Sequence, residues 1–152
     1  KAGHEVNAFD LSEEALAAAR DNGCTTFTDA SEAVQGVDGV VSMLPNGGIV
    51  KSVYEGSVIG KAPEGAVLLD CSTIDVATAK EVIARAEAAG YDMVDAPVSG
   101  GIAAANGGTL TFMVGGTDKA FARAEEVLQG LRRFRGRLPA PDRLSRDAAH
   151  ER

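Results

Sequence analysis

The sequence has few cysteines and no long apolar run, the features that are typical of secreted, cysteine-rich metal-binding and membrane proteins. It contains two cysteines, Cys24 and Cys71, which are too few and too far apart for a disulfide framework or a cysteine-rich zinc site. No apolar run approaches the roughly 20 residues that cross a bilayer, and no basic segment followed by an apolar one forms a secretory leader. We therefore expect a cytoplasmic protein with no metal and no membrane partner.

The chain also lacks net positive charge. Its formal net charge is −7 at pH 7 and its pI is about 4.8. Such a surface repels phosphate backbones instead of displacing their counterions, so nucleic acid is excluded as a partner. With 152 residues, of which 45% are hydrophobic and 24% charged, the chain has the proportions of one globular domain with one core.

The chain start lacks features that the rest of the sequence leads us to expect. There is no initiator methionine, and Lys1 to His4 resemble the end of a helix, with a cation in the last turn and a glycine cap. The Gly-x-Gly-x-x-Gly phosphate loop occurs nowhere in the 152 residues. We therefore expect that a first strand, a phosphate loop and most of a first helix are missing upstream.

What the sequence does contain is a regular alternation of strands and helices. Strands are predicted over residues 5–9, 25–28, 39–44, 66–70, 92–96 and 109–114. Helices are predicted from the cap Ser12 to Arg20, over residues 31–34, 49–59 and 75–89, and from about residue 117. Residues 40–44 and 67–69 are apolar on both faces, as in a parallel sheet covered by helices on each side. The pattern predicts a doubly wound α/β fold.

The composition changes abruptly at residue 132. Residues 1–131 carry 8 Lys+Arg against 19 Asp+Glu, a net charge of −11, whereas residues 132–152 carry 7 against 3, a net charge of +4. This tail has two prolines and no apolar periodicity, which predicts irregular structure. A shifted reading frame or a truncated gene would produce such a break. The alternative is a genuine basic tail that folds back on the acidic domain.

In doubly wound sheets, ligands bind beyond the carboxyl ends of the strands. Asp10 follows the first visible strand, where a carboxylate accepts hydrogen bonds from an adenosine ribose and repels a 2′-phosphate. That position favours NAD over NADP. The alternative is that Asp10 belongs to the polar cap of the next helix, and the sequence alone leaves both interpretations open.

Two further strand ends carry candidate cofactor contacts. Met43, Leu44 and Pro45 precede paired glycines, where an apolar wall and exposed backbone can face a flat ring, although a tight loop before a helix would look the same. After the next strand, Ser72 and Thr73 precede a helix, where their hydroxyls can either cap the helix or bind a ligand. From these residues alone, capping is the favoured role. We interpret the neighbouring Cys71 as an inert apolar residue.

The last strand end combines a hydroxyl with permissive backbone. In Asp95-Ala96-Pro97-Val98-Ser99-Gly100-Gly101, a strand is followed by a proline, a serine and two glycines that let backbone N–H groups converge. Such a concavity suits a carboxylate. A structural turn alone is the alternative, but the clustering of a hydroxyl donor and permissive backbone at a strand end favours Ser99, Gly100 and Gly101 as a substrate-binding turn.

Taken together, these segments resemble the β-hydroxyacid dehydrogenase family over residues 1 to about 130. The matching stretches are Lys1 to His4, Ser42 to Pro45, Asp70 to Asp75, Asp95 to Gly101 and Gly108 to Gly116. The resemblance implies a Rossmann-like, mostly parallel sheet, NAD contacts at Leu44, Pro45 and Thr73, and a substrate carboxylate at Ser99, Gly100 and Gly101. It also implies reversible hydride transfer between a small 3-hydroxyacid and nicotinamide, which in this family belongs to valine breakdown.

The chain departs from the family pattern in its second half. The resemblance implies a relay lysine on a long helix after the first domain, and a helical second domain that completes the pocket and the homo-oligomer, yet no lysine follows Lys119. The catalytic residue is therefore unknown, and we expect the chain alone to be inactive. Two alternatives stay open: a related reductase of tartronate semialdehyde, glyoxylate or succinic semialdehyde, and a non-catalytic cofactor-binding or interaction remnant.

Overall fold

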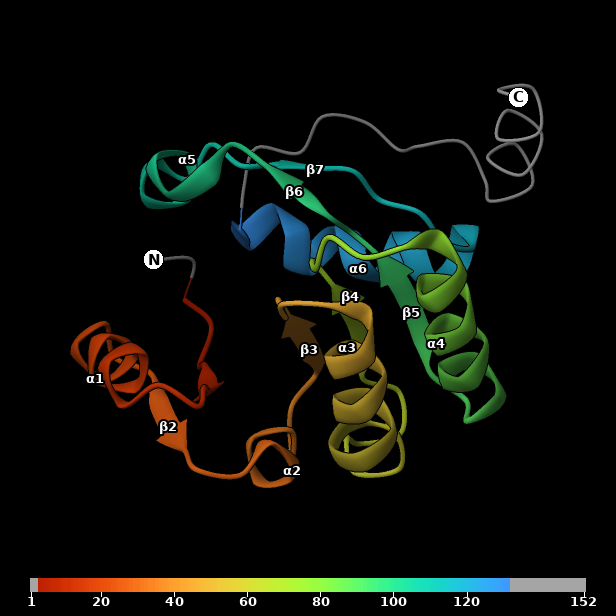
Figure 1. Ribbon diagram of the computed structural model, residues 1–152, viewed down its shortest axis with the longest axis horizontal. Coiled ribbons are helices and arrows are strands. Elements are labelled where there is room, and N and C mark those ends of the chain that lie inside the picture. The colour runs from red at the N-terminus through yellow and green to blue at the C-terminus, as the bar shows by residue number, and fades with distance from the viewer. Residues whose placement is uncertain (1–2, 132–152) are drawn as a thin grey trace.

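The computed structural model describes residues 3–131, which form short strands with helices packed against them (Figure 1). The strands are β1 (Asn7–Phe9), β2 (Thr25–Phe27), β3 (Gly39–Ser42), β4 (Val67–Asp70), β5 (Asp92–Asp95), β6 (Val98–Ser99) and β7 (Thr111–Phe112). The helices are α1 (Glu13–Asp21), α2 (Ala30–Ala33), α3 (Gly47–Val53), the π-helical turn η1 (Tyr54–Val58), α4 (Val76–Ala88), α5 (Gly101–Gly107) and α6 (Asp118–Leu131). The predicted irregular tail, 132–152, lies outside the described residues.

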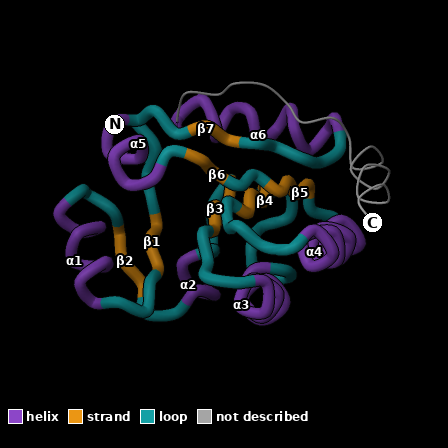
Figure 2. Tube along the Cα trace, turned by 45° about the horizontal axis from the view of Figure 1, so that its top comes forward, coloured by secondary structure: helices purple, strands orange, loops and turns teal. Residues whose placement is uncertain are grey.

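The centre of the fold is a parallel three-stranded sheet in the order β3-β4-β5. Figure 2 shows α6 on one side of these strands and α3 and α4 on the other. Because side chains alternate along a strand, Leu68 and Met93 enter the core beneath α3 and α4, while Leu69 and Val94 enter the core beneath α6. The α/β class and the parallel, helix-covered sheet predicted from the sequence are confirmed.

The sheet is interrupted between β1 and β3. Within residues 3–131, β1 pairs only with β2 and β3 only with β4, so each strand keeps one edge without a strand partner. The prediction that the third visible strand is covered on both faces is wrong at Val41, whose side chain is 46% exposed. The reason is that α6 packs mainly against β5 and β4, so Val41 lies at the margin of the face that this helix covers.

The helix boundaries follow local capping chemistry. Ser12 Oγ accepts a hydrogen bond from Ala15 N at the start of α1, as predicted. Helix α3 begins earlier than predicted, because Asn46 Oδ1 accepts a bond from Ile49 N and so caps the preceding turn. Gly90, the predicted stop of α4, has a φ of +90°, which glycine adopts without the cost that a Cβ atom imposes.

The segment after β5 differs most from the prediction. Strands β6 and β7 form a separate antiparallel pair, and α5 lies between them in the sequence, where no helix was predicted. The strand expected over 109–114 is confined to Thr111–Phe112, followed by an isolated bridge between Asp95 and Gly115. An alanine-rich helix flanked by glycines has no apolar stripe, so hydrophobic periodicity could not reveal it.

The described part of the chain has no helix that combines the length and the apolar character required to cross a membrane.

Candidate functional site

The turns that follow β3, β4 and β5 leave the central sheet at one edge, because the three strands are parallel neighbours (Figure 1). Hydrogen bonds connect these turns. Leu44 N donates to Ser72 Oγ at 2.8 Å, which joins the first turn to the second. Ala96 N donates to the carbonyl of Asp70 at 2.7 Å, which extends the ladder from β4 to the start of the third turn. The three turns therefore lie at a common edge of the sheet.

A polar row lies beneath this edge. Ser42, Asp70 and Asp95 are paired in register on adjacent strands, so their side chains project from the same face of the sheet. Asp70 is 2% exposed, and its Oδ1 accepts hydrogen bonds from Ser42 Oγ (2.8 Å), Ser72 Oγ (2.6 Å) and Ser72 N (3.2 Å). Tyr54, fully buried in η1, lies with its hydroxyl 2.8 Å from Ser42 Oγ.

This row corrects one sequence interpretation. Ser72 and Thr73 do not cap α4, because the cap is Asp75, whose Oδ1 accepts a bond from Thr78 N at 2.9 Å. Ser72 is instead buried and bonded to Asp70, while Thr73 is exposed at the edge. Sequence reasoning assigned no role to Asp70. The available signal was a carboxylate at the end of a wholly apolar strand, followed closely by a hydroxyl.

Large apolar side chains are exposed in the segments that follow β3, β4 and β6. Met43 is 70% exposed, while Leu44 is partly buried against the core beneath α3 and Pro45 is exposed. Val76, at the start of α4, is 55% exposed, and Ile102, at the start of α5, is 82% exposed. Large apolar side chains left exposed, such as Met43 and Val76 in the segments after β3 and β4, are typical of a surface that receives a ligand or another part of a protein.

The predicted carboxylate turn is open to solvent. Ser99, Gly100 and Gly101 are all exposed, and both glycines have positive φ angles, +132° and +65°. A Cβ atom added at Gly100 would lie 2.5 Å from the Cβ of Ala104, so this position has no room for a side chain. No side chain caps the start of α5 at Gly100, which leaves the backbone donors of this turn available to an anion.

Asp10 lies apart from this group, at the end of β1 in the separate two-stranded sheet. Its Oδ1 accepts a bond from Ser12 N at 2.8 Å, so the capping interpretation holds for one carboxylate oxygen. The ribose contact stays a prediction.

Burial sets the protonation behaviour of two groups near the polar row. Burial and then the charges of Asp70 and Asp95 raise the pKa of Cys71 to about 12, so its thiol is unreactive at neutral pH, as the sequence interpretation held. Burial, followed by the charge of Asp70, raises the pKa of Asp95 from 3.8 to about 6. Asp95 therefore takes up a proton in mildly acidic solution, at the edge where the three turns meet.

The raised pKa of Asp95 predicts a pH-dependent stability. A carboxyl whose pKa is higher in the folded state than in the unfolded state destabilises the fold as the pH rises from its unfolded value, 3.8, through about 6. We expect Asp95→Asn to raise the free energy of unfolding by about 1 to 2 kcal/mol near pH 8, after allowance for the partial exposure of the carboxyl. Near pH 4 the two proteins should be equally stable.

Urea unfolding at the two pH values measures this difference. The matched control is Asp38→Asn, at an exposed carboxylate on the opposite end of the sheet, which should change stability little at either pH. A gain for Asp95→Asn that is the same at both pH values would contradict the assignment to ionisation.

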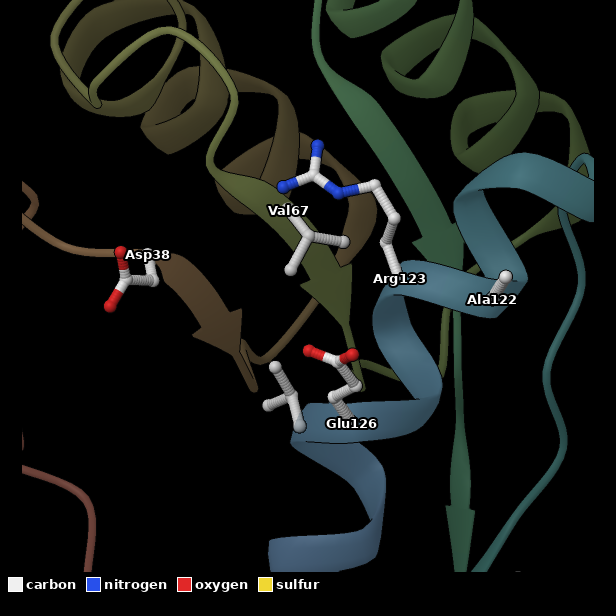
Figure 3. Close-up of a pocket in the computed structure, with 6 residues that line it drawn as sticks. Asp38, Val67, Ala122, Arg123 and Glu126 are labelled. Atoms are coloured by element: carbon white, nitrogen blue, oxygen red, sulfur yellow. The ribbon is translucent and has the colours of Figure 1, made fainter.

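A hollow of about 390 Å³ lies at the opposite edge of the sheet, between the amino ends of β3 and β4 and helix α6 (Figure 3). Its lining includes Asp38, Val67, Arg123 and Glu126. The Arg123 guanidinium already bonds to Asp92 Oδ2, at 3.1 Å, and to the carbonyl of Gly65. This arginine thus holds the loop before β4 to β5, and we assign the hollow a structural role.

The parallel sheet and its ligand edge define a domain of the dinucleotide-binding class. The profile of the NAD binding domain of 6-phosphogluconate dehydrogenase matches residues 1–133, and the chain belongs to this family. It is 42% identical, over 88% of its length, to the 3-hydroxyisobutyrate dehydrogenase of Pseudomonas aeruginosa. It is 40% identical, also over 88%, to the NAD-dependent L-serine dehydrogenase of the same organism.

A solved structure agrees with these sequence relationships. The 3-hydroxyisobutyrate dehydrogenase of Mycobacterium tuberculosis, solved with L-serine, has a TM-score of 0.84 and 41% identity over 88% of this chain and 46% of its own. The chain spans 45% of the length of each of the two Pseudomonas relatives. Within residues 3–131, no group of three or more His, Cys, Asp or Glu side chains is arranged to hold a metal ion.

Proposed function

We propose that this chain is the cofactor-binding part of an NAD-dependent oxidoreductase that interconverts 3-hydroxyisobutyrate and methylmalonate semialdehyde, the step of valine degradation. The identity of 42% to a 3-hydroxyisobutyrate dehydrogenase supports this reaction. In the complete enzyme, a small hydroxyacid would be the substrate and a homo-oligomer the working form. We expect the protein to act in the cytoplasm.

The observation that carries the proposal is the common edge of three turns, joined by the bonds from Leu44 N to Ser72 Oγ and from Ala96 N to the carbonyl of Asp70. We assign Met43, Leu44, Pro45 and Thr73 to the nicotinamide end of NAD, because they lie in two turns joined by the Leu44–Ser72 bond, and Met43, Pro45 and Thr73 are exposed there. When bound, NAD accepts or returns the hydride, while the protein orients the reacting groups and limits the access of water.

Ser99, Gly100 and Gly101 are assigned to the substrate carboxylate. Their exposed backbone donors and the Ser99 hydroxyl can hold an anion next to the turns after β3 and β4. Asp10 is assigned to the adenosine ribose, because its second carboxylate oxygen is not needed for the bond to Ser12 N. We also propose that residues 1–131 are a partial domain. The sheet of β1 and β2 and the sheet of β3, β4 and β5 are both parallel, but among the residues that the structure describes no strand pairs β1 with β3 to join them.

Calorimetric titration of the chain with NAD and NADP tests the cofactor assignment. We expect NAD to bind more tightly than NADP by about tenfold, because the Asp10 carboxylate repels a 2′-phosphate. Asp10→Asn should reduce this preference without abolishing NAD binding. The control is Asp21→Asn, an exposed carboxylate at the end of α1. Equal affinity for both dinucleotides, or binding of neither, would contradict the assignment.

A second candidate substrate is L-serine, which is also a 3-hydroxyacid. The relative that supports it is the NAD-dependent L-serine dehydrogenase, at 40% identity, close to the 42% of the first relative. The carboxylate turn would serve both substrates, because both carry a carboxylate. Rates with 3-hydroxyisobutyrate, L-serine, tartronate semialdehyde, glyoxylate and succinic semialdehyde, measured on a complete enzyme that contains this domain, would separate the candidates.

A further inference from the structure

The buried carboxylate of Asp70 lies at the centre of the hydrogen bonds that join the turns after β3 and β4. All three of its donors reach one oxygen, Oδ1: Ser42 Oγ, Ser72 Oγ and Ser72 N. Both serines have a further partner, since Ser72 Oγ accepts from Leu44 N and Ser42 Oγ lies 2.8 Å from the Tyr54 hydroxyl. The network therefore runs from the backbone of one turn to the backbone of the next.

The direction of each hydrogen bond follows from the number of available protons. A carboxylate accepts and cannot donate, so the single hydroxyl proton of Ser72 goes to Asp70, which leaves the Ser72 oxygen free to accept from Leu44 N. Ser42 likewise gives its proton to Asp70 at 2.8 Å rather than to the carbonyl of Leu69 at 3.5 Å. The Tyr54 hydroxyl must then donate to Ser42, and burial keeps it protonated by raising the pKa of Tyr54.

The network limits how the two turns can move relative to each other. Ser72 is 1% exposed and Asp70 2%, so neither can rotate toward water without losing buried hydrogen bonds. Leu44 is fixed through its amide, and Thr73 follows Ser72 directly in the chain. Both neighbours are residues that the proposed function assigns to the cofactor. Hydrogen bonds to a charged acceptor are stronger than those to a neutral one. The Asp70 carboxylate can therefore hold the two turns together more firmly than a neutral side chain would.

We propose that Asp70 is a positioning residue that, through Ser72, holds the turns of Leu44 and Thr73 in the mutual arrangement that receives the nicotinamide end of the cofactor. This inference rests on the proposed function for its ligand, but the connection between the turns can be measured without one. Asp70 does not touch the reacting atoms in this assignment; it acts through the serine.

The first test is amide hydrogen exchange, measured by NMR on the 152-residue chain. We expect Ser72→Ala to speed exchange at Leu44 N by about tenfold or more, because its acceptor is removed. Asp70→Asn, which keeps the shape and one acceptor oxygen, should have a smaller effect. Ile49 N, which donates to Asn46 Oδ1 at the start of α3, is the internal control. Its exchange rate should stay unchanged, which would show that the fold is intact. Ser52→Ala, at an exposed serine of α3, is the matched control.

The second test compares the affinities of NAD and ADP-ribose, which lacks the nicotinamide ring. For Ser72→Ala we expect about tenfold weaker binding of NAD, and for Asp70→Asn a smaller loss. Binding of ADP-ribose should be unchanged in both variants, an asymmetry that a general loss of stability would not produce. An unchanged ratio of the two affinities overturns the positioning role. If the unsubstituted chain binds no NAD, the proposed function fails, and Leu44 exchange alone decides whether Asp70 and Ser72 join the two turns. Unchanged exchange there overturns the inference.

Discussion

In an assay with 3-hydroxyisobutyrate and NAD, the 152-residue chain is expected to turn over about 10⁴-fold more slowly than the Pseudomonas aeruginosa relative, or slower still. Loss of a general acid or base alone typically costs about 10² to 10⁴ in rate. The chain spans 45% of that relative and has no lysine after Lys119 for the proton relay that the family resemblance implies. Positioning is lost as well, which adds to the effect.

The solvent exposure of the site gives the same expectation on independent grounds. Ser99, Gly100 and Thr73 are exposed within the described part of the chain, so water would reach the hydride-transfer position. The measurement is the absorbance change of NADH formation under saturating NAD, with the Pseudomonas enzyme assayed in parallel. A rate within tenfold of that enzyme would contradict the expectation and would require a catalytic group within these 152 residues.

Replacement of Gly100 by alanine is expected to cost about 2 to 4 kcal/mol in the free energy of unfolding. The added Cβ would lie 2.5 Å from the Cβ of Ala104, and the φ angle of +132° is one that residues with a side chain rarely adopt. Helix α5 would have to shift away from β6, which would also displace the proposed carboxylate turn. Urea unfolding monitored by circular dichroism measures the cost.

Gly101→Ala is the matched control for this substitution. Its φ of +65° lies in the left-handed region, and no atom lies within 4 Å of an added Cβ, so we expect a cost of about 1 kcal/mol from backbone strain alone. Equal costs for the two variants would show that the contact with Ala104 relaxes freely. The steric part of the expectation would then be wrong.

Much of the fold was predictable from local sequence signals. The strand through Leu68 and Leu69 was recognisable because a short apolar run bounded by turn residues is typical of a strand in a helix-covered parallel sheet. Helix α4 was recognisable because Val82 and Ala86 recur at helical spacing before the stop at Gly90. The edge that carries the candidate site followed from these elements, since parallel strands direct the turns after them to one side.

Other features depended on contacts between residues far apart in the sequence. The bonds of Asp70 to Ser42 and of Ser72 to Leu44 each span 28 positions, so no local pattern could pair them. Capping by Ser72 was the better interpretation from sequence alone, yet Asp75 lies at the helix start and the Ser72 hydroxyl is buried against a carboxylate. Helix α5 was missed because it has no buried residue and hence no apolar stripe.

By itself, the sequence determined the class of fold and the order of most of its elements, because hydrophobic periodicity and capping act over a few neighbouring residues. Only the tertiary structure decided which polar groups meet at that edge, how Asp95 comes to hold its proton more tightly, and that β1 and β3 do not pair. These outcomes depend on strand register and burial, which arise when distant segments pack against each other.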